Sequence, residues 1–347
     1  MKTLIHRSPA RGSNAGQKVS FRIRARTLAV CLALAALLIA LAFFSLAAGR
    51  FDTGMADVFN ALSGQAAGKT RMIVLEWRLP RTLLVALLGA ALGLGGAIFQ
   101  SLTRNPLGSP DIIGFAAGSH TGALVVLLLF SGGYYATAFG ALGGGIVTAA
   151  LVYVLAGTTG QQGFRLIVVG ISISAMLSAF DAWMIRKADL EMAMGAAFWA
   201  AGSLNGLGFE QLRPAVMLFC LLCLPLAALA RPMRQMELGD DVALASGVAQ
   251  RRTRGLLMLL GVALTALATA TAGPISFIAL CAPQIARRLV GASGVGLFTP
   301  ALTGAVLLVL ADTAAQHAFG RQLPVGIMTI SVGGLYLLWL LIREGRR

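Results

Sequence analysis

Charged residues are scarce in this sequence. Only 12% of its 347 residues are Asp, Glu, Lys or Arg, against about 25% in soluble proteins, and 57% are hydrophobic. This composition argues against an ordinary soluble enzyme. The 13 acidic residues are outnumbered by 28 basic ones, which stand at the ends of apolar runs. That placement is typical of membrane proteins, and it argues against a nucleic-acid-binding face, which interleaves basic and aromatic side chains.

Residues for catalysis or metal binding are also few. The chain has four cysteines and three histidines, and Cys220 and Cys223 form a C-x-x-C inside an apolar run. We interpret them as ordinary helix cysteines. His120 and His317 are single histidines without an H-E-x-x-H or G-x-S-x-G motif, so we expect packed or path-lining roles. We therefore predict no catalytic residue and no metal site. We also predict that the protein is not an intramembrane enzyme.

Long apolar runs are plentiful. About 20 apolar residues cross the ~30 Å hydrocarbon core as a helix. The sequence therefore predicts an all-α polytopic membrane protein, a compact bundle of about ten transmembrane helices. The eighth and ninth spans, 276–289 and 301–318, are short or interrupted, as helices buried within a bundle can be. The predicted spans are 27–48, 82–102, 112–131, 135–156, 166–185, 214–230, 256–272, 276–289, 301–318 and 325–342.

The distribution of basic residues predicts the orientation. Residues 1–26 form a basic arm before the first run, which is too long for the apolar part of a signal peptide. With ten spans, 19 of the 28 Lys and Arg fall on the side of this arm. We therefore expect both termini in the cytoplasm. Residues 27–343 form the transmembrane domain, residues 49–81 an outer, periplasmic loop, and residues 231–255 a cytoplasmic loop.

Glycines recur four residues apart in three of the apolar runs. Two small residues at this spacing lie on one helix face and let a second backbone approach closely. General glycine richness, with 42 glycines in the chain, is the alternative explanation. The pairs are Gly89 and Gly93, Gly118 and Gly122, and Gly140 and Gly144.

The stretch SGQAAGKT, residues 63–70, is similar to a phosphate-binding loop, but its glycine spacing is one residue short. A P-loop follows a strand and opens a helix. No apolar strand precedes this stretch and no helix clearly follows it, and the predicted outer location has no ATP. We therefore expect a flexible loop.

Residues 231–255 form the largest internal hydrophilic stretch on the predicted cytoplasmic side. We expect two short helical pieces here, with Asp240 and Asp241 at a helix N-terminus and Gly247 at its end. Either this is a plain surface loop, or its apolar residues fit a groove on a partner. Those apolar residues are Leu238, Val242, Leu244 and Ala245.

Here the chain resembles a known family. LGDDVALASGV (residues 238–248) is similar to the L-G-x-x-x-A-x-x-L-G-[VL] loop of FecCD-type permeases, the cobalamin and ferric-siderophore importers of the ABC class, with Ser246 in place of the family's Leu. Four further blocks match in order, so that the resemblance covers residues 27–343. They are Arg78–Gly114, Phe198–Gly206, Gly273–Gly291, and Ala311–Asp312 with Leu323–Thr329.

The resemblance implies an inner-membrane permease subunit that carries a ferric siderophore from periplasm to cytoplasm. It implies a second permease, two ABC ATPase subunits, a periplasmic substrate-binding protein and surrounding lipid as partners. This chain would bind no cofactor, since ATP and Mg belong to the ATPase. The residues implied in ATPase coupling are Leu238, Gly239, Asp240, Asp241, Ala243, Leu244, Ala245, Gly247 and Val248.

Two further sets of residues gain roles only from the resemblance. Arg78 and Arg81 correspond to arginines that dock acidic residues of the binding protein; the alternative is anchoring at the membrane interface. A second set corresponds to loops that narrow the inner exit; the alternative for Pro106 is that it simply ends a helix. This cytoplasmic gate comprises Asn105, Pro106, Leu107, Gly163 and Phe164.

Departures from the family pattern bear on the partner and the cargo. Gln284, Gln316 and Gln322 replace the family's His, Arg and Glu, and Arg321 is a candidate substitute for the missing Arg. This set most resembles the ferric enterobactin branch, whose importers pair two unlike permeases, so we expect a heterodimer. Catecholate, hydroxamate, haem and cobalamin cargoes remain open, in that order.

A proton-coupled secondary carrier is the competing hypothesis. Asp181 and Asp312 lie within or near predicted spans, where carboxylates are costly and are often functional. Asp181 is five residues before Arg186 and could pair with it. Asp312 belongs to the family's A-D pair and is expected to satisfy a helix end or neighbouring backbone.

Overall fold

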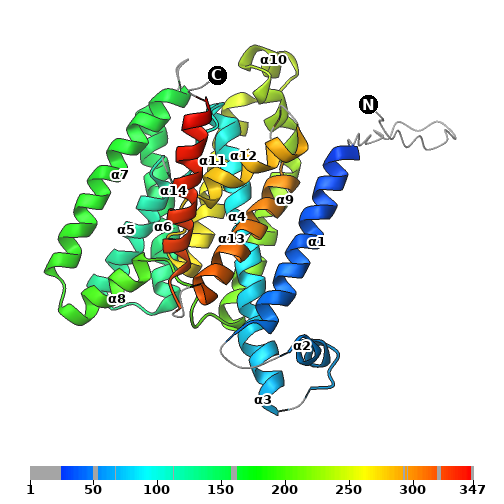
Figure 1. The fold of residues 1–347 in the computed structure, drawn as a ribbon. Coiled ribbons are helices and arrows are strands. Elements are labelled where there is room, and N and C mark those ends of the chain that lie inside the picture. Colours follow the sequence, from blue (N-terminus) through cyan, green and yellow to red (C-terminus); the bar gives the residue numbers. More distant parts are fainter. Residues whose placement is uncertain are drawn as a thin grey trace.

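The computed structural model describes residues 25–49, 54–66, 68–111, 113–157, 162–291, 294, 296–318 and 322–344 (Figure 1). Within these ranges nearly every residue is helical and there is no strand, which confirms the all-α fold class. Most of the basic arm, residues 1–24, lies outside the described residues, as does Arg321.

A helix is present at each of the ten expected spans. Seven are long and apolar enough to cross a membrane, and α5 and α14 are apolar but shorter. α12 has only 13 residues and carries two arginines in its last turn. These ten helices are α1 (Ala25–Ala47), α4 (Leu79–Thr103), α5 (Phe115–Leu129), α6 (Tyr134–Ala156), α7 (Gln162–Lys187), α9 (Phe209–Glu237), α11 (Gln250–Ala272), α12 (Ile278–Val290), α13 (Phe298–His317) and α14 (Val325–Glu344).

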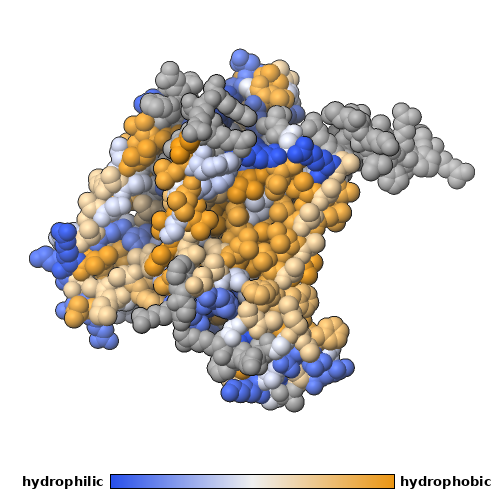
Figure 2. Space-filling model, viewed as in Figure 1, coloured by the Kyte–Doolittle hydropathy of each residue, from blue (hydrophilic) through white to orange (hydrophobic). Residues whose placement is uncertain are grey.

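α4 and α11 form the centre of the bundle. Their apolar windows are 78% buried, against 6% in α1 and 17% in α7 and α9, which lie at the periphery. Most of the buried apolar side chains of α4 and α11 belong to one core cluster. A broad hydrophobic band crosses the middle of the molecule, with hydrophilic residues gathered toward its two ends (Figure 2). This pattern is that of a protein embedded in a bilayer.

Glycine contacts set the closest helix pairs, as the spacing predicted. A methyl group on Gly122 of α5 would lie 2.2 Å from the Gly140 carbonyl oxygen of α6, and one on Gly144 would lie 2.2 Å from the Gly118 oxygen. On α4, a methyl group on Gly93 would meet the Pro300 oxygen of α13 at 2.2 Å. All three glycine pairs therefore serve close backbone packing.

α12 begins inside the protein and spans only part of the bundle. Its N-cap, Phe277, adopts a left-handed conformation with φ 69°. The Phe277 backbone N–H donates to Oδ2 of Asp111 at 3.2 Å, and Asp111 precedes α5. The Asp111 side chain therefore satisfies a backbone N–H at the start of α12 that the helix itself leaves unpaired.

Residues 49–81 are mostly helical, which was not predicted from the sequence. They contain α2 (Met55–Leu62), α3 (Gly68–Arg71) and the π-helical segment η1 (Met72–Arg78), which continues into α4. In the expected loop SGQAAGKT, residues 63–66 are not helical, but α3 begins inside the stretch at Gly68. The element that precedes the stretch is α2, a helix and not a strand. α2 packs Val58 and Ala61 against Leu46 at the end of α1.

Two further helices complete the chain. α8 (Leu190–Ala200) lies in the stretch expected to be a polar interlude between spans, and α10 (Asp240–Ala245) projects from one end of the bundle. The start of α1, the end of α14 and α10 all lie at this end, whereas α2, α3 and α8 lie at the opposite end (Figure 1). The first and last described helices thus have their outer ends on the side of the predicted coupling loop.

Contact between α4 and α12 gives a stability test. A methyl group on Gly96 would lie 1.7 Å from the Ala279 carbonyl oxygen of α12. Gly96→Ala should therefore force the helices apart and destabilise the protein by about 1–3 kcal/mol, lowering its thermal unfolding midpoint in detergent. Gly143→Ala is the matched control, since a methyl group there meets nothing within 4 Å. Equal midpoints for the two variants would contradict this packing.

Candidate functional site at the cytoplasmic end

The segment between α9 and α11 forms a single projecting helix, α10. Two positive-φ glycines bound it: Gly239 with φ 125° before it and Gly247 with φ 80° after it. The N–H of Ala243 donates to the Gly239 carbonyl at 3.0 Å, and that of Val248 donates to the Ala243 carbonyl at 3.0 Å. Asp240 and Asp241 open the helix, as predicted. Residues 231–237 continue α9, so the expectation of a second separate helical piece was wrong.

α10 is anchored from beneath and apolar on its outer face. Ala243 is fully buried and Val248 nearly so, and both belong to the main core cluster. Leu238 is 71% exposed, Leu244 59% and Val242 46%, although they project beyond the bundle at its hydrophilic end. Exposed apolar side chains grouped on a projecting helix are typical of a protein-binding surface.

Two arginines from other helices hold Asp240. Arg104, the residue after α4, makes an ion pair with its carboxylate, and Arg254 of α11 approaches Oδ1 of Asp240 at 3.4 Å. Arg104 also donates to the Met236 carbonyl at the end of α9 at 2.9 Å. Neither of these contacts with Asp240 was predicted from the sequence, although Arg104 directly precedes the predicted gate residues.

Asn105, Pro106 and Leu107 form a tight turn next to α10, which we call the gate turn. The Leu107 N–H donates to Oδ1 of Asn105 at 2.9 Å. Gln284 of α12 donates its side-chain amide to the Pro106 carbonyl. The family's His at this position is therefore replaced by a residue that ties α12 to the gate turn.

Gly163 and Phe164 belong to the first turn of α7 and not to a loop before it. The structure describes only their backbone. The predicted loop placement was therefore wrong, and their role at the inner exit stays a prediction.

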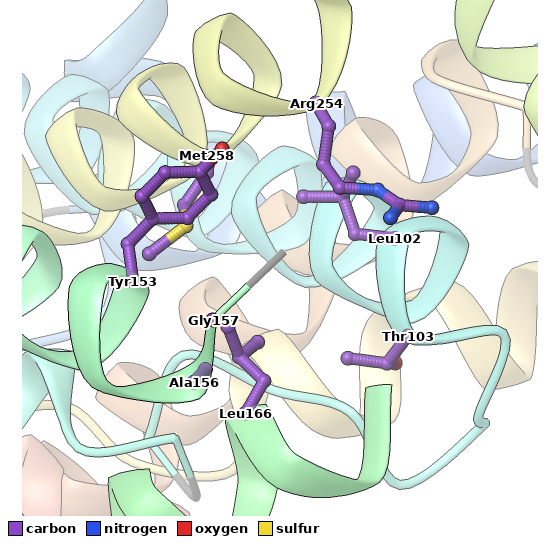
Figure 3. Close-up of a pocket in the computed structure, with 8 residues that line it drawn as sticks. All are labelled: Leu102, Thr103, Tyr153, Ala156, Gly157, Leu166, Arg254 and Met258. Carbon is purple, nitrogen blue, oxygen red and sulfur yellow. The ribbon is translucent and has the colours of Figure 1, made fainter. Parts of the chain in front are cut away.

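A small cavity of about 30 Å³ lies beside the gate turn (Figure 3). Thr103 of α4, Leu166 of α7 and Arg254 of α11 contribute to its walls. This volume accommodates water but not a ferric siderophore.

At the opposite end, Arg78 and Arg81 both point into the protein. Arg78 donates to the carbonyls of Leu46 and Ala47 at 2.7 and 3.1 Å, and so caps the C-terminus of α1. Arg81 forms a two-pronged ion pair with Asp312 of α13, at 2.8 Å for the shorter bond, with side chains 17% and 4% exposed. Docking of a binding protein by these residues stays a prediction.

Asp312 is the centre of a polar cluster at the outer end. Arg81 also donates to Oδ1 of Asn205 at 2.7 Å, and Gln316 donates to Oδ2 of Asp312 at 2.6 Å. Gln316, which stands where the family has Arg, therefore adds a neutral donor to a carboxylate already paired with one arginine. Asp312 accepts hydrogen bonds from side chains. The sequence had predicted that it would accept them from a helix end or from neighbouring backbone.

Asp181 pairs with His120. The sequence had suggested Arg186 as its partner. Nδ1 of His120 lies 2.9 Å from Oδ2 of Asp181, which is 5% exposed. The His120 ring stacks on Trp199 of α8 with centroids 5.7 Å apart. This pair joins α5, α7 and α8 near the outer end of the bundle.

Comparison with known proteins adds independent findings. The family model described as the FecCD transport family matches residues 37–343. The chain is 50% identical over 323 residues to the ferric enterobactin transport system permease protein FepG of Escherichia coli strain K12, covering 93% of this chain and 98% of that protein. It is 34% identical to the iron(3+)-hydroxamate import system permease protein FhuG of Bacillus subtilis strain 168, covering 90% and 97%.

A solved structure shows the same fold. It is of a metal-chelate type ABC transporter in an inward-facing conformation, and it matches with a TM-score of 0.79 and 28% sequence identity. The match covers 91% of this chain and 99% of the other.

The Arg81–Asp312 pair gives a test of its role. Removing one partner of a buried ion pair leaves an unpaired charge, so Arg81→Ala should destabilise the isolated chain by about 3 kcal/mol. Thermal unfolding in detergent measures this without any binding protein present. Arg71→Ala, at an exposed arginine of the same end, is the control. If Arg81→Ala unfolds with the parent midpoint and only weakens binding-protein affinity, the residue acts in docking and not in the fold.

Proposed function

Because this chain belongs to the FecCD transport family, we propose that it is the permease subunit through which an ABC importer moves a ferric siderophore from periplasm to cytoplasm. The family match over residues 37–343 carries this proposal. The chain is a membrane-embedded transport component. Its helical bundle and the projecting α10 support an import cycle in which ATP is hydrolysed by a separate subunit.

The cargo is a catecholate siderophore of the enterobactin type. Identity is 50% to a ferric enterobactin permease and 34% to a hydroxamate permease, over a similar share of the chain. This difference supports catecholate over hydroxamate, haem or cobalamin. In such an importer much of the cargo selection falls to the substrate-binding protein.

The partners follow from the two ends of the bundle. ATPase subunits dock at the end that carries α10, and the binding protein docks at the end that carries α2 and α8. A second, unlike FecCD-type permease completes the transport path. Gln284, Gln316 and Gln322 support a heterodimer, because this set most resembles the ferric enterobactin branch, whose importers pair two unlike permeases.

Nucleotide and Mg belong to the ATPase and not to this chain. SGQAAGKT begins directly after α2 and runs into α3, at the end opposite α10. A membrane with α10 and both termini on its cytoplasmic face puts this stretch in the periplasm. The same orientation agrees with the excess of basic residues on the α10 side.

A proton-coupled carrier remains the competing function, and His120–Asp181 is the observation in its favour. The other intramembrane carboxylate considered, Asp312, is already held by Arg81 and Gln316. One carboxylate–imidazole pair is weaker support than a family match over most of the chain.

Docking at α10 is tested by placing a charge on its exposed face. Ala245 is exposed on α10, so Ala245→Arg should bury an unpaired charge in the interface and reduce ATPase co-purification and uptake to background. Lys69→Ala, in the SGQAAGKT stretch, is the control. It should retain ATPase co-purification, ATP hydrolysis and uptake. Loss of ATP hydrolysis in Lys69→Ala, or undiminished import by Ala245→Arg, would contradict the proposal.

Cargo choice is tested in a strain that lacks its own ferric enterobactin permease and is supplied with this chain and its partners. Under iron limitation we expect uptake of labelled ferric enterobactin, with no competition from an excess of a ferric hydroxamate. Uptake of the hydroxamate instead would overturn the assignment of a catecholate.

A further inference from the structure

Arg104 occupies an unusual position between the coupling helix and the gate turn. It ends α4 in a left-handed conformation with φ 49°, which is uncommon for a residue other than glycine. This turn directs its guanidinium toward α10. There it reaches both the Met236 carbonyl at the end of α9 and the carboxylate of Asp240.

Asp240 is held from two sides, so α10 is tied to α4 and α11 together. Arg254 of α11 approaches the same carboxylate oxygen at 3.4 Å. Gln250, the first residue of α11, donates its side-chain amide to the Asp240 carbonyl. A movement of α10 therefore acts directly on the ends of two central helices.

The gate turn that follows Arg104 is stiff. Asn105 accepts two hydrogen bonds at 2.9 Å, from the Leu107 N–H to its side chain and from the Gly108 N–H to its carbonyl. A turn braced in this way moves as a unit when Arg104 is displaced.

On its far side the gate turn is attached to α12. Gln284 donates to the Pro106 carbonyl, two residues after Arg104. The end of α4 contributes a further tie, since Gln100 donates to the Leu280 carbonyl at 2.9 Å and accepts from Arg287. At the start of α12, Asp111 holds the Phe277 N–H. The segment from Gln100 to Asp111 thus binds α12 along its length.

We infer that Arg104 is a positioning residue for transport: it transmits displacement of α10 through the gate turn to α12. This inference rests on the proposed function. It adds a specific mechanical contact, Asp240–Arg104–Pro106–Gln284, between the ATPase-docking helix and a helix that begins inside the bundle.

Exposure and geometry separate this role from a role in folding. The Arg104 and Asp240 side chains are 42% and 45% exposed, and ion pairs this exposed contribute little to stability. Nη2 of the Arg104 guanidinium donates to a carbonyl and a carboxylate at the same time. The rigid planar guanidinium loses less conformational freedom per hydrogen bond than a lysine ammonium does. Arg104 is therefore suited to hold two elements in register and is not needed to hold the fold together.

The test compares Arg104→Ala with Arg251→Ala in the assembled complex, since Arg251 is an exposed arginine of the same end. Arg104→Ala should keep the ATPase bound and ATP hydrolysis near the parent level. Uptake should fall roughly 2- to 30-fold, the range expected when a coupling contact is lost. Arg251→Ala should leave all three unchanged.

Two further variants identify the contact itself. Asp240→Asn keeps the shape of the side chain and should reproduce the uptake defect, and Arg104→Lys should restore uptake only in part. Parent-level uptake in Arg104→Ala would overturn the inference while leaving the proposed function intact. Loss of the ATPase from that variant would overturn it too, because Arg104 would then only build the docking surface. A parent complex that holds no ATPase would defeat the proposed function itself.

Discussion

Close backbone contact between α4 and its neighbours is the constraint on which the rest of the structure depends. Lipid supplies no hydrophobic force between helices, so packing of small residues must hold the bundle together. Gly89 and Gly93 of α4 meet α13, and Gly96 meets α12. With these contacts α4 becomes a fixed central helix that reaches both ends of the molecule.

The two ends of α4 carry opposite kinds of electrostatic contact. At the outer end, Arg81 is paired with Asp312 in a nearly buried cluster, where loss of one partner is costly. At the end that carries α10, Arg104 and Asp240 are half-exposed, so their pair adds little to stability. One helix therefore joins a nearly buried ion pair at one end to a half-exposed ion pair at the other.

Much of the bundle was predictable because hydrophobic length determines transmembrane helices. Every expected apolar run contains a helix, and the three glycine pairs mark real contacts. The helices within residues 49–81 were not predicted, because glycines and polar residues mask short amphipathic helices there. α2 owes its position to packing of Val58 and Ala61 against α1, which local sequence does not show.

The site was predictable where it is local and not where it is assembled. Asp240, Asp241 and Gly247 predicted a short helix from the chemistry of helix ends alone. The Arg104–Asp240 pair joins residues 136 positions apart, and nothing in either segment indicates the other. Asp181 was paired with the wrong residue for the same reason, since its partner His120 lies 61 positions away.

The energy source for uptake tests the central claim most directly. The assembled complex is reconstituted in vesicles, with the binding protein and labelled ferric enterobactin on the side opposite α10. An ATP-coupled permease predicts uptake that requires ATP on the α10 side and continues when an ionophore collapses the proton gradient. Uptake that runs on the proton gradient without ATP would contradict an ABC mechanism and would favour a carrier built around His120 and Asp181.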